Sequence, residues 1–260
     1  KMRMRILFTN DDGVFSQGLR ALLLAFAQEG NELYVSAPDA ERSGASHSFT
    51  MFMPLRAQQV TIPGVEDVTA YAVSGTPVDC VKLAYGNLFP RPDLLISGIN
   101  LGANRGTDIF YSGTVSAAME GAILGIPSVA VSNIAWKPNC FEAAVSGAKY
   151  AASLLMCMPE LRLLNVNAPD LSLAQVKGVR FTPAGVQEYE THYDERMDPY
   201  GQKYYWLPAG RKSQCDAEAD CDEAWTNRGY IAITPIVTNM TDETTLVRLR
   251  AKQNEITLEL

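Results

Sequence analysis

The feature that most restricts the fold of this chain is the alternation of short apolar runs with helical segments through about residue 170. The runs do not alternate cleanly between apolar and polar residues, as a strand with one solvent-exposed face would. They are therefore typical of strands in a parallel sheet that is buried on both faces. The predicted strands cover residues 6–10, 32–38, 93–100, 128–133 and 161–169.

Helical segments separate these strands, at residues 16–29, 77–86, 113–124 and 141–157. The second of them has a clear start signal, since Thr76, Pro77 and Asp79 resemble an N-cap, a first-turn proline and the acidic partner of a capping box. Strands that alternate with helices predict a doubly wound α/β domain with a mostly parallel sheet. We assign residues 1–175 to this domain.

Two parts of the chain depart from the pattern. Residues 49–73 alternate more and are expected to form a β excursion. Residues 176–260 are predicted to form a β-rich extension that packs between subunits. Its strand-like segments are 179–185, 202–208, 229–236 and 244–250, and the acidic segment 214–225 is expected to be a solvated loop.

Composition excludes several classes of protein. The net charge of −7 argues against a nucleic acid polymer as partner, because like charges repel. No apolar run approaches the roughly 20 residues of a membrane span, so no membrane partner is expected. The five cysteines form no C-x-x-C pair, which argues against a zinc site and favours the reducing cytoplasm.

The most informative polar residues follow the first strand, where Asp11 and Asp12 stand next to each other between Asn10 and Gly13. Ligands of open α/β sheets bind at the carboxyl ends of the strands. The pair is either part of a tight turn or a site for a hard divalent cation, which would remove the repulsion between the carboxylates. Ser43 and Asn100 follow two other strands and are either turn residues or further oxygen ligands.

A second candidate is the helix start at Ser112, Gly113 and Thr114. Its first N–H groups and the positive end of the helix dipole suit a phosphate, and ordinary capping by a hydroxyl is compatible with that role. His47 lies in the same loop as Ser43 and is either a loop residue or a general acid. The sequence has no dinucleotide-binding, P-loop or serine-hydrolase motif.

Taken together, these residues resemble the SurE (survival protein E) family of metal-dependent 5′-nucleotidases. The resemblance covers nearly the whole chain. It rests on residues 10–13 (NDDG), 38–48 (PDAERSGASHS), 74–81 (SGTPVDCV), 92–106 (PDLLISGINLGANRG), 111–121 (YSGTVSAAMEG), 165–169 (NVNAP) and, more weakly, 229–236 (GYIAITPI).

The resemblance implies a Rossmann-like, three-layer αβα fold, with a C-terminal extension exchanged between the subunits of a homodimer or homotetramer. It implies one divalent cation per subunit, Mg²⁺ or Mn²⁺, held by Asp11, Asp12, Ser43 and Asn100. It implies a phosphate pocket at Asn10, Ser112, Gly113 and Thr114. The implied activity is hydrolysis of nucleoside 5′- and 3′-monophosphates and short polyphosphate. The segment 210–230 looks longer and more acidic than the family pattern.

Asp11 is the predicted metal ligand and proton acceptor, and Asp12 is the second carboxylate, bound to the metal or next to its ligands. Two other functions remain open. Asp11 could be a covalent nucleophile, although such sites usually have a D-x-D arrangement. The chain could also be a non-catalytic regulator that binds nucleotides on the same fold.

Overall fold

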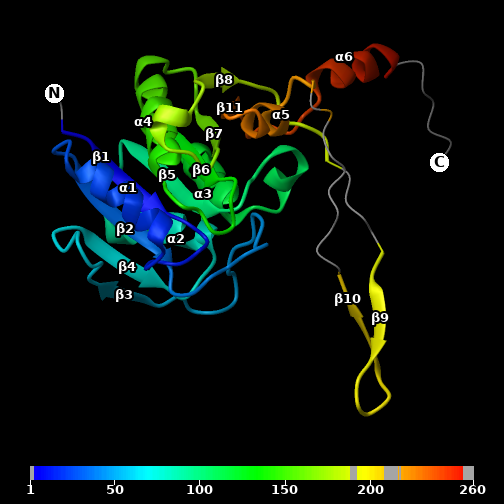
Figure 1. Ribbon diagram of the computed structural model, residues 1–260, viewed down its shortest axis with the longest axis horizontal. Helices are drawn as coiled ribbons and strands as arrows, with labels where there is room; N and C mark the ends of the chain where they lie inside the picture. The colour runs from blue at the N-terminus through cyan, green and yellow to red at the C-terminus, as the bar shows by residue number, and fades with distance from the viewer. Residues whose placement is uncertain (1–2, 188–191, 208–215, 217, 254–260) are drawn as a thin grey trace.

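The computed structural model describes residues 3–187, 192–207, 216 and 218–253. Its centre is a nine-stranded sheet with the order β3-β4-β2-β1-β5-β6-β7-β11-β8 (Figure 1). The sheet strands are β1 (Arg5–Thr9), β2 (Glu32–Pro38), β3 (Ala57–Val60), β4 (Thr69–Val73), β5 (Leu94–Leu101), β6 (Ser128–Asn133), β7 (Leu163–Ala168), β8 (Val179–Phe181) and β11 (Ile231–Pro235).

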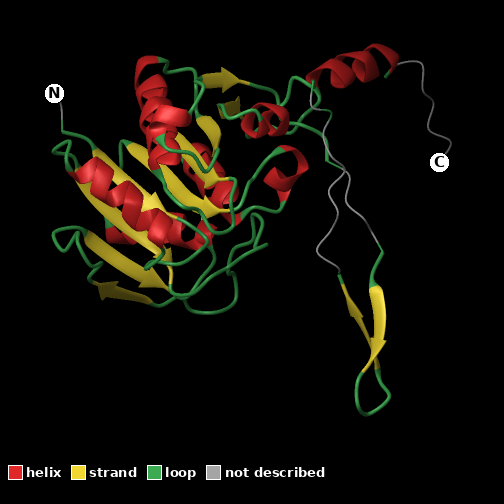
Figure 2. Cartoon of the chain, in the orientation of Figure 1, coloured by secondary structure: helices red, strands yellow, loops and turns green. Residues whose placement is uncertain are grey.

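Helices cover both faces of the sheet (Figure 2). The four main ones are α1 (Gln17–Ala27), α2 (Pro77–Leu83), α3 (Gly113–Ile123) and α4 (Glu142–Cys157). Helices α1 and α4 pack on one face and contribute to one hydrophobic cluster, whereas α2 and α3 contribute to a second cluster on the other. The α/β class and the three layers predicted from the sequence are therefore confirmed.

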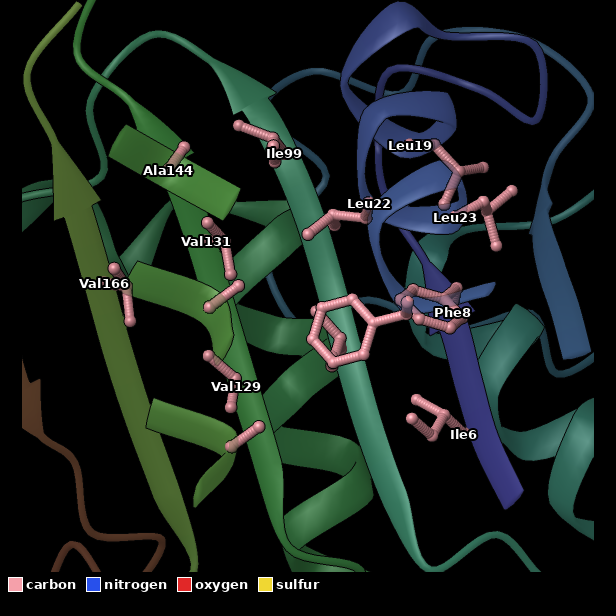
Figure 3. Packing of buried hydrophobic residues seen from close by; sticks show 14 of the residues in the cluster. Ile6, Phe8, Leu19, Leu22, Leu23, Ile99, Val129, Val131, Ala144 and Val166 are labelled. Atoms are coloured by element: carbon pink, nitrogen blue, oxygen red, sulfur yellow. The ribbon is translucent and has the colours of Figure 1, made fainter. Parts of the chain in front are cut away.

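Strand β1 shows why its apolar run is continuous. Ile6 and Phe8 belong to the cluster under α1 and α4, and Leu7, between them, belongs to the cluster under α2 and α3. Figure 3 shows Phe8 on the side of β1 that faces α1, near Leu22 and Leu23 of that helix. Because successive side chains of a strand point to opposite faces, a strand covered on both sides is apolar at consecutive positions. Full burial of a residue such as Phe8 contributes about 1.5–3 kcal/mol.

The sheet has its topological switch point between β1 and β5. From β1 the chain builds β2 and β4 on one side, and then crosses to build β5, β6 and β7 on the other. All of these neighbours pair in parallel. A crevice opens at the carboxyl ends of strands where the winding direction reverses, and Asp11 and Asn100 lie at that point.

The C-terminal part of the chain contains more than an arm. Strand β11 pairs antiparallel with β7 and parallel with β8, so both strands extend the main sheet. A separate antiparallel hairpin, β9 (Asp194–Met197) with β10 (Lys203–Trp206), extends away from the body (Figure 1). Two short helices follow it, α5 (Asp222–Asn227) and α6 (Glu243–Lys252).

Two predictions for this region were wrong. Residues 244–250 form helix α6, because Asp242 caps its start and Arg250 and Lys252 lie in its last turn, where cations are favourable. The acidic segment is not simply solvated. Asp222 is fully buried in α5 and accepts hydrogen bonds from the N–H groups of Gly106 and Gly185, at 2.8 and 3.0 Å.

The β excursion at residues 49–73 is also more integrated than predicted. Strand β4 pairs in parallel with β2 as a member of the main sheet, and β3 closes the edge in antiparallel orientation.

The capping box of α2 is confirmed, with Thr76 and Asp79 as its partners. No helix in the described ranges is both long and apolar enough to cross a bilayer.

Candidate active site

A pocket of about 460 Å³ opens at the carboxyl ends of the central strands. It brings together residues that lie far apart in the sequence, from the loops after β1, β2, β5 and β6. Its walls are formed by Asp11, Asp12, Glu41, Ser43, Gly44, Asn100, Leu101, Ala103, Asn104, Asp108, Tyr111, Ser112 and Trp136. All four predicted metal ligands, Asp11, Asp12, Ser43 and Asn100, therefore line the same pocket.

The turn after β1 is built by Asn10. Its side-chain amide donates to the carbonyl oxygen of Gly13 at 2.9 Å and to the hydroxyl of Ser16 at 2.6 Å, and its oxygen accepts from the N–H of Gly13. The side chain is fully buried. Asn10 thus fixes the chain so that Asp11 and Asp12 reach the pocket. Asn10 itself is not part of the pocket wall. Its contact with phosphate stays a prediction.

Asp11 is held by the start of α3. One carboxylate oxygen accepts from the N–H of Thr114 at 3.1 Å, and the other accepts from the Thr114 hydroxyl. This close approach explains the glycine before Thr114. A Cβ atom at Gly113 would lie 2.9 Å from the Cβ and from one carboxylate oxygen of Asp11, so any side chain there would push the carboxylate away.

Asp12 has a weaker anchor, a hydrogen bond of 3.3 Å from the N–H of Leu101 to its Oδ2 atom. Burial raises the pKa of Asp12 to about 7, with a further contribution from the neighbouring charge of Asp11. Burial also raises the pKa of Asp11, although its hydrogen bonds from Thr114 oppose the shift. Both carboxyl groups are therefore costly to ionise in this pocket unless a positive charge is present.

The pocket has no such charge of its own. In the part of the chain that the structure describes, no lysine, arginine or histidine contributes to its walls, whereas Glu41 and Asp108 add two more carboxyl groups. Two adjacent carboxylates, one buried and one half-buried, next to neutral oxygen donors form the kind of ligand set that hard divalent cations prefer. The residues present thus fit a divalent cation.

The two neutral donors differ in how they are held. Asn100 donates its amide N–H to the carbonyl oxygen of Gly102 at 2.8 Å, which fixes the amide and leaves its oxygen for a ligand. The Ser43 hydroxyl donates to Glu41, so its lone pairs remain available. The Ser43 loop is tied to the turn after β1 by a hydrogen bond of 2.8 Å from the N–H of Arg42 to the carbonyl oxygen of Asp11.

The start of α3 is largely committed to the protein itself. Ser112 caps the helix by accepting from the N–H of Val115 at 3.1 Å, and the N–H of Thr114 is donated to Asp11. Of the predicted phosphate residues, only Ser112 lines the pocket, while Gly113 and Thr114 lie behind Asp11. The positive end of the α3 dipole nevertheless faces this part of the pocket and favours negative charge there.

His47 does not line this pocket. Its Nε2 lies 2.9 Å from a carboxylate oxygen of the buried Glu120, whose other oxygen accepts from Lys82 at 3.1 Å. The imidazole contributes to the wall of a different, mainly apolar cavity. The geometry gives His47 a place in loop anchoring, and its role as a general acid stays a prediction.

Sequence reasoning missed the two aromatic walls of the pocket, Tyr111 and Trp136. Tyr111 directly precedes the predicted helix start. Trp136 follows the strand at residues 128–133, so the rule that ligands bind after parallel strands could have indicated it. An isolated tryptophan in a loop of mixed composition gave no signal of its own.

Comparisons with known proteins identify the family of the chain. The family described as "Survival protein SurE" matches residues 6–191. A protein of Desulfitobacterium hafniense named 5′-nucleotidase SurE is 44% identical over 252 residues, which are 95% of this chain and 96% of that protein. A protein of Symbiobacterium thermophilum with the same name is 45% identical, over 94% and 96% of the two chains.

A solved structure supports the same assignment. The crystal structure of the SurE protein from Aquifex aeolicus superposes with a TM-score of 0.81 at 37% sequence identity, over 97% of this chain and 100% of that one. The sequence match covers most of the chain and includes the pocket residues from β1 to β6. This chain therefore belongs to the SurE family.

Proposed function

We propose that this protein is a phosphomonoesterase that hydrolyses nucleoside 5′-monophosphates to a nucleoside and phosphate. The observation that carries the proposal is the adjacent pair of the buried Asp11 and the half-buried Asp12, which shares a pocket with neutral oxygen donors and without a basic side chain among the described residues. The relatives named 5′-nucleotidase SurE support the substrate class. Nucleoside 3′-monophosphates and short polyphosphate are further proposed substrates.

We propose one divalent cation per subunit, Mg²⁺ or Mn²⁺, with Asp11, Asp12, Ser43 and Asn100 as its ligands. When bound, such a cation neutralises phosphate charge and lowers the pKa of bound water. Thr114 fixes the orientation of the Asp11 carboxylate by donating to both of its oxygens. Asp11 accepts a proton from the attacking water, whose oxygen bonds to phosphorus as the bond from phosphorus to the 5′ oxygen breaks. The leaving 5′ oxygen takes up a proton from solvent and departs as the hydroxyl of the nucleoside.

Phosphate release from a panel of all ribo- and deoxyribonucleoside monophosphates tests this proposal. Turnover of any member distinguishes an enzyme from a non-catalytic nucleotide-binding regulator. Rapid quenching during turnover tests the covalent alternative, because a nucleophilic Asp11 would accumulate as a phosphoaspartate whereas attack by water leaves the protein unmodified.

A pH-dependent stability is expected for the metal-free protein. Burial raises the folded-state pKa of Asp12 to about 7, above its ordinary value of 3.8, so the native state binds more protons than the unfolded state between these pH values. The free energy of unfolding must then fall as the pH rises through this range. We expect the Tm in EDTA to be lower at pH 8 than at pH 5.

Added Mn²⁺ should raise the Tm more at pH 8 than at pH 5, because the cation and the proton compete for the same carboxylates. The matched control is Asp12→Asn, which removes the titrating group and should flatten the metal-free profile. An equal effect of Mn²⁺ at both pH values would contradict a site at this pair.

We propose that the protein is a homodimer or homotetramer whose contacts include the β9–β10 hairpin. A two-stranded hairpin is marginally stable by itself in water, and this one exposes large side chains such as Tyr200, Tyr205 and Trp206. Helix α6 has ten residues, none of them buried, and isolated helices of this length are also marginal. Both elements therefore need a surface to pack on.

Replacing residues 194–206 by a short Gly-Ser linker should lower the mass measured by light scattering, because it removes the exposed aromatic side chains. This change spares α5, whose buried residues pack against the body. Lys203→Ala is the control, since it removes a hairpin charge but keeps the aromatic residues, and it should keep the wild-type mass. An unchanged mass after the replacement would rule out the hairpin as a subunit contact.

We also propose a cytoplasmic location, as the cysteine pattern predicts. Cys80, Cys140, Cys157 and Cys221 are free thiols in the structure, and Cys215 lies outside the described residues.

A further inference from the structure

Trp136 is an unusual side chain for the wall of a pocket lined by carboxylates. It follows β6 and is 77% exposed, although it is the largest apolar side chain in that wall. Leaving so much apolar surface in water is unfavourable, and large exposed aromatic groups beside a pocket commonly mark ligand contacts. The geometry around the indole ring shows how it could serve one.

One face of the ring is covered by Gly102. A Cβ atom at Gly102 would lie 3.2 Å from each of the ring atoms Cδ2, Cε2 and Cε3. Equal distances to three adjacent atoms of the six-membered ring place that position above the ring centre. Gly102 also has a φ of +111°, which L side chains rarely adopt. The glycine therefore lets the backbone support one face of the indole, while the Trp136 side chain as a whole remains 77% exposed.

The backbone on both sides of the indole ring is held by hydrogen bonds before any ligand binds. The N–H of Gly102 donates to the carbonyl oxygen of Asn133 at 2.9 Å, which joins the loops after β5 and β6. The side-chain oxygen of Asn133 accepts from the N–H of Ala135 at 2.9 Å, one residue before Trp136. A ring that is held in place beforehand loses little conformational entropy when a ligand stacks on it.

The position of Trp136 relative to the aspartate pair suits one class of ligand. The sheet order places β5 between β1, after which Asp11 and Asp12 follow, and β6, after which Trp136 follows. Neighbouring strands are about 4.8 Å apart, so the ends of β1 and β6 are separated by about 10 Å. A phosphate at the aspartate pair would leave room for a ribose over the end of β5 and for a planar base at Trp136.

The charge of the pocket supports a neutral contact at this end. Glu41 and Asp108 line the pocket in addition to the aspartate pair. These carboxyl groups would repel any negative charge that a substrate carried beyond its phosphate. Stacking on an aromatic face is independent of charge and tolerant of base identity. We propose that Trp136 stacks on the nucleobase of the substrate and makes the site prefer nucleotides to phosphorylated sugars. This inference rests on the proposed function and deepens it.

The test compares adenosine 5′-monophosphate with ribose 5-phosphate, which has the same sugar and phosphate but no base. In Trp136→Ala the KM for the nucleotide should rise about tenfold with little change in kcat, because uniform binding energy is lost. The preference for the nucleotide over ribose 5-phosphate should fall by the same factor. Trp136→Phe retains a ring and should recover part of the preference.

A proportional loss on both substrates would overturn the proposal, since it would mean that Trp136 only supports the fold of the pocket. Trp206→Phe is the control variant. It removes another exposed tryptophan, 60% accessible and located in β10 outside the pocket, and should keep the wild-type preference.

A binding measurement separates this inference from the proposed function. Adenosine should quench the tryptophan fluorescence of the wild-type protein and of Trp206→Phe, and ribose should not. The quenching should disappear in Trp136→Phe, although two of the three tryptophans remain. If the wild-type protein hydrolyses neither phosphate ester but shows this quenching, the proposed hydrolase activity is refuted and the stacking of Trp136 on the base is supported. Quenching that persists in Trp136→Phe would refute the proposal that Trp136 stacks on the base.

Discussion

Asp11→Asn is expected to lower kcat by a thousandfold or more on a nucleoside 5′-monophosphate at saturating Mn²⁺. The substitution keeps the shape of the side chain but removes the buried negative charge of the aspartate pair and the proposed proton acceptor. A thousandfold loss corresponds to about 4 kcal/mol of transition-state stabilisation, which is reasonable for the loss of a metal ligand together with its activated water. Steady-state kinetics on the purified variant measures the effect.

Thr114→Ala is the matched comparison for this variant. It removes the hydroxyl that donates to Asp11 and leaves the backbone N–H that donates to the other carboxylate oxygen. Loss of one hydrogen bond to a charged group costs about 1–3 kcal/mol, so the decrease in kcat should be milder. A folded Asp11→Asn protein that is more active than Thr114→Ala would show that Asp11 is not the central ligand.

Folding of Asp11→Asn can be checked separately. Burial raises the pKa of Asp11, which means that the folded protein holds an ionised carboxylate there at a cost. An amide carries no such cost, so the Tm of the variant in EDTA at pH 8 should not fall below that of the wild type. A large decrease in Tm would assign the loss of kcat to misfolding.

Removal of divalent cations should reduce phosphate release to background. The described residues in the pocket walls include four carboxyl groups and no basic side chain, so without a cation the side chains of the pocket would repel a phosphate dianion. Activity should be lost in EDTA and should return when Mn²⁺ or Mg²⁺ is added in excess. Phosphate release before and after addition of the cation is the measurement.

Two controls define the result. The first control compares the phosphate release restored by Ca²⁺ and Zn²⁺ with that restored by Mn²⁺ and Mg²⁺ at the same free concentration. EDTA removes any divalent ion, so only this comparison identifies the functional cation. Circular dichroism in EDTA shows whether the chain remains folded during the assay. Full activity after exhaustive chelation and dialysis would exclude the proposed metal site.

The sequence by itself determined the α/β core and the location of the site. A strand buried on both faces is apolar at consecutive positions through its middle, and this requirement left a readable signal in residues 6–8 and 129–131. Because parallel strands end at one edge of the sheet, the polar residues after them had to meet, and Asp11, Asp12, Ser43 and Asn100 do line one pocket. These inferences need only local patterns and a general rule of chain connection.

Tertiary structure alone decided which polar residues face the pocket. The phosphate contacts of Asn10 and Thr114 stay predictions, whereas the structure shows that Asn10 builds the turn after β1 and that Thr114 holds Asp11. A short polar side chain satisfies its hydrogen bonds with whichever group lies closest, and sequence does not record that distance.

The same limit applies to the chain after residue 175. Residues 244–250 have β-branched residues in a short run, yet capping and end charges make them helical. Asp222 lies in an acidic segment, yet it is buried because the N–H groups of Gly106 and Gly185 need an acceptor. Trp136 became a candidate for base recognition only when the fold placed Gly102 under its ring. Such contacts depend on residues distant in the sequence, and no local pattern encodes them.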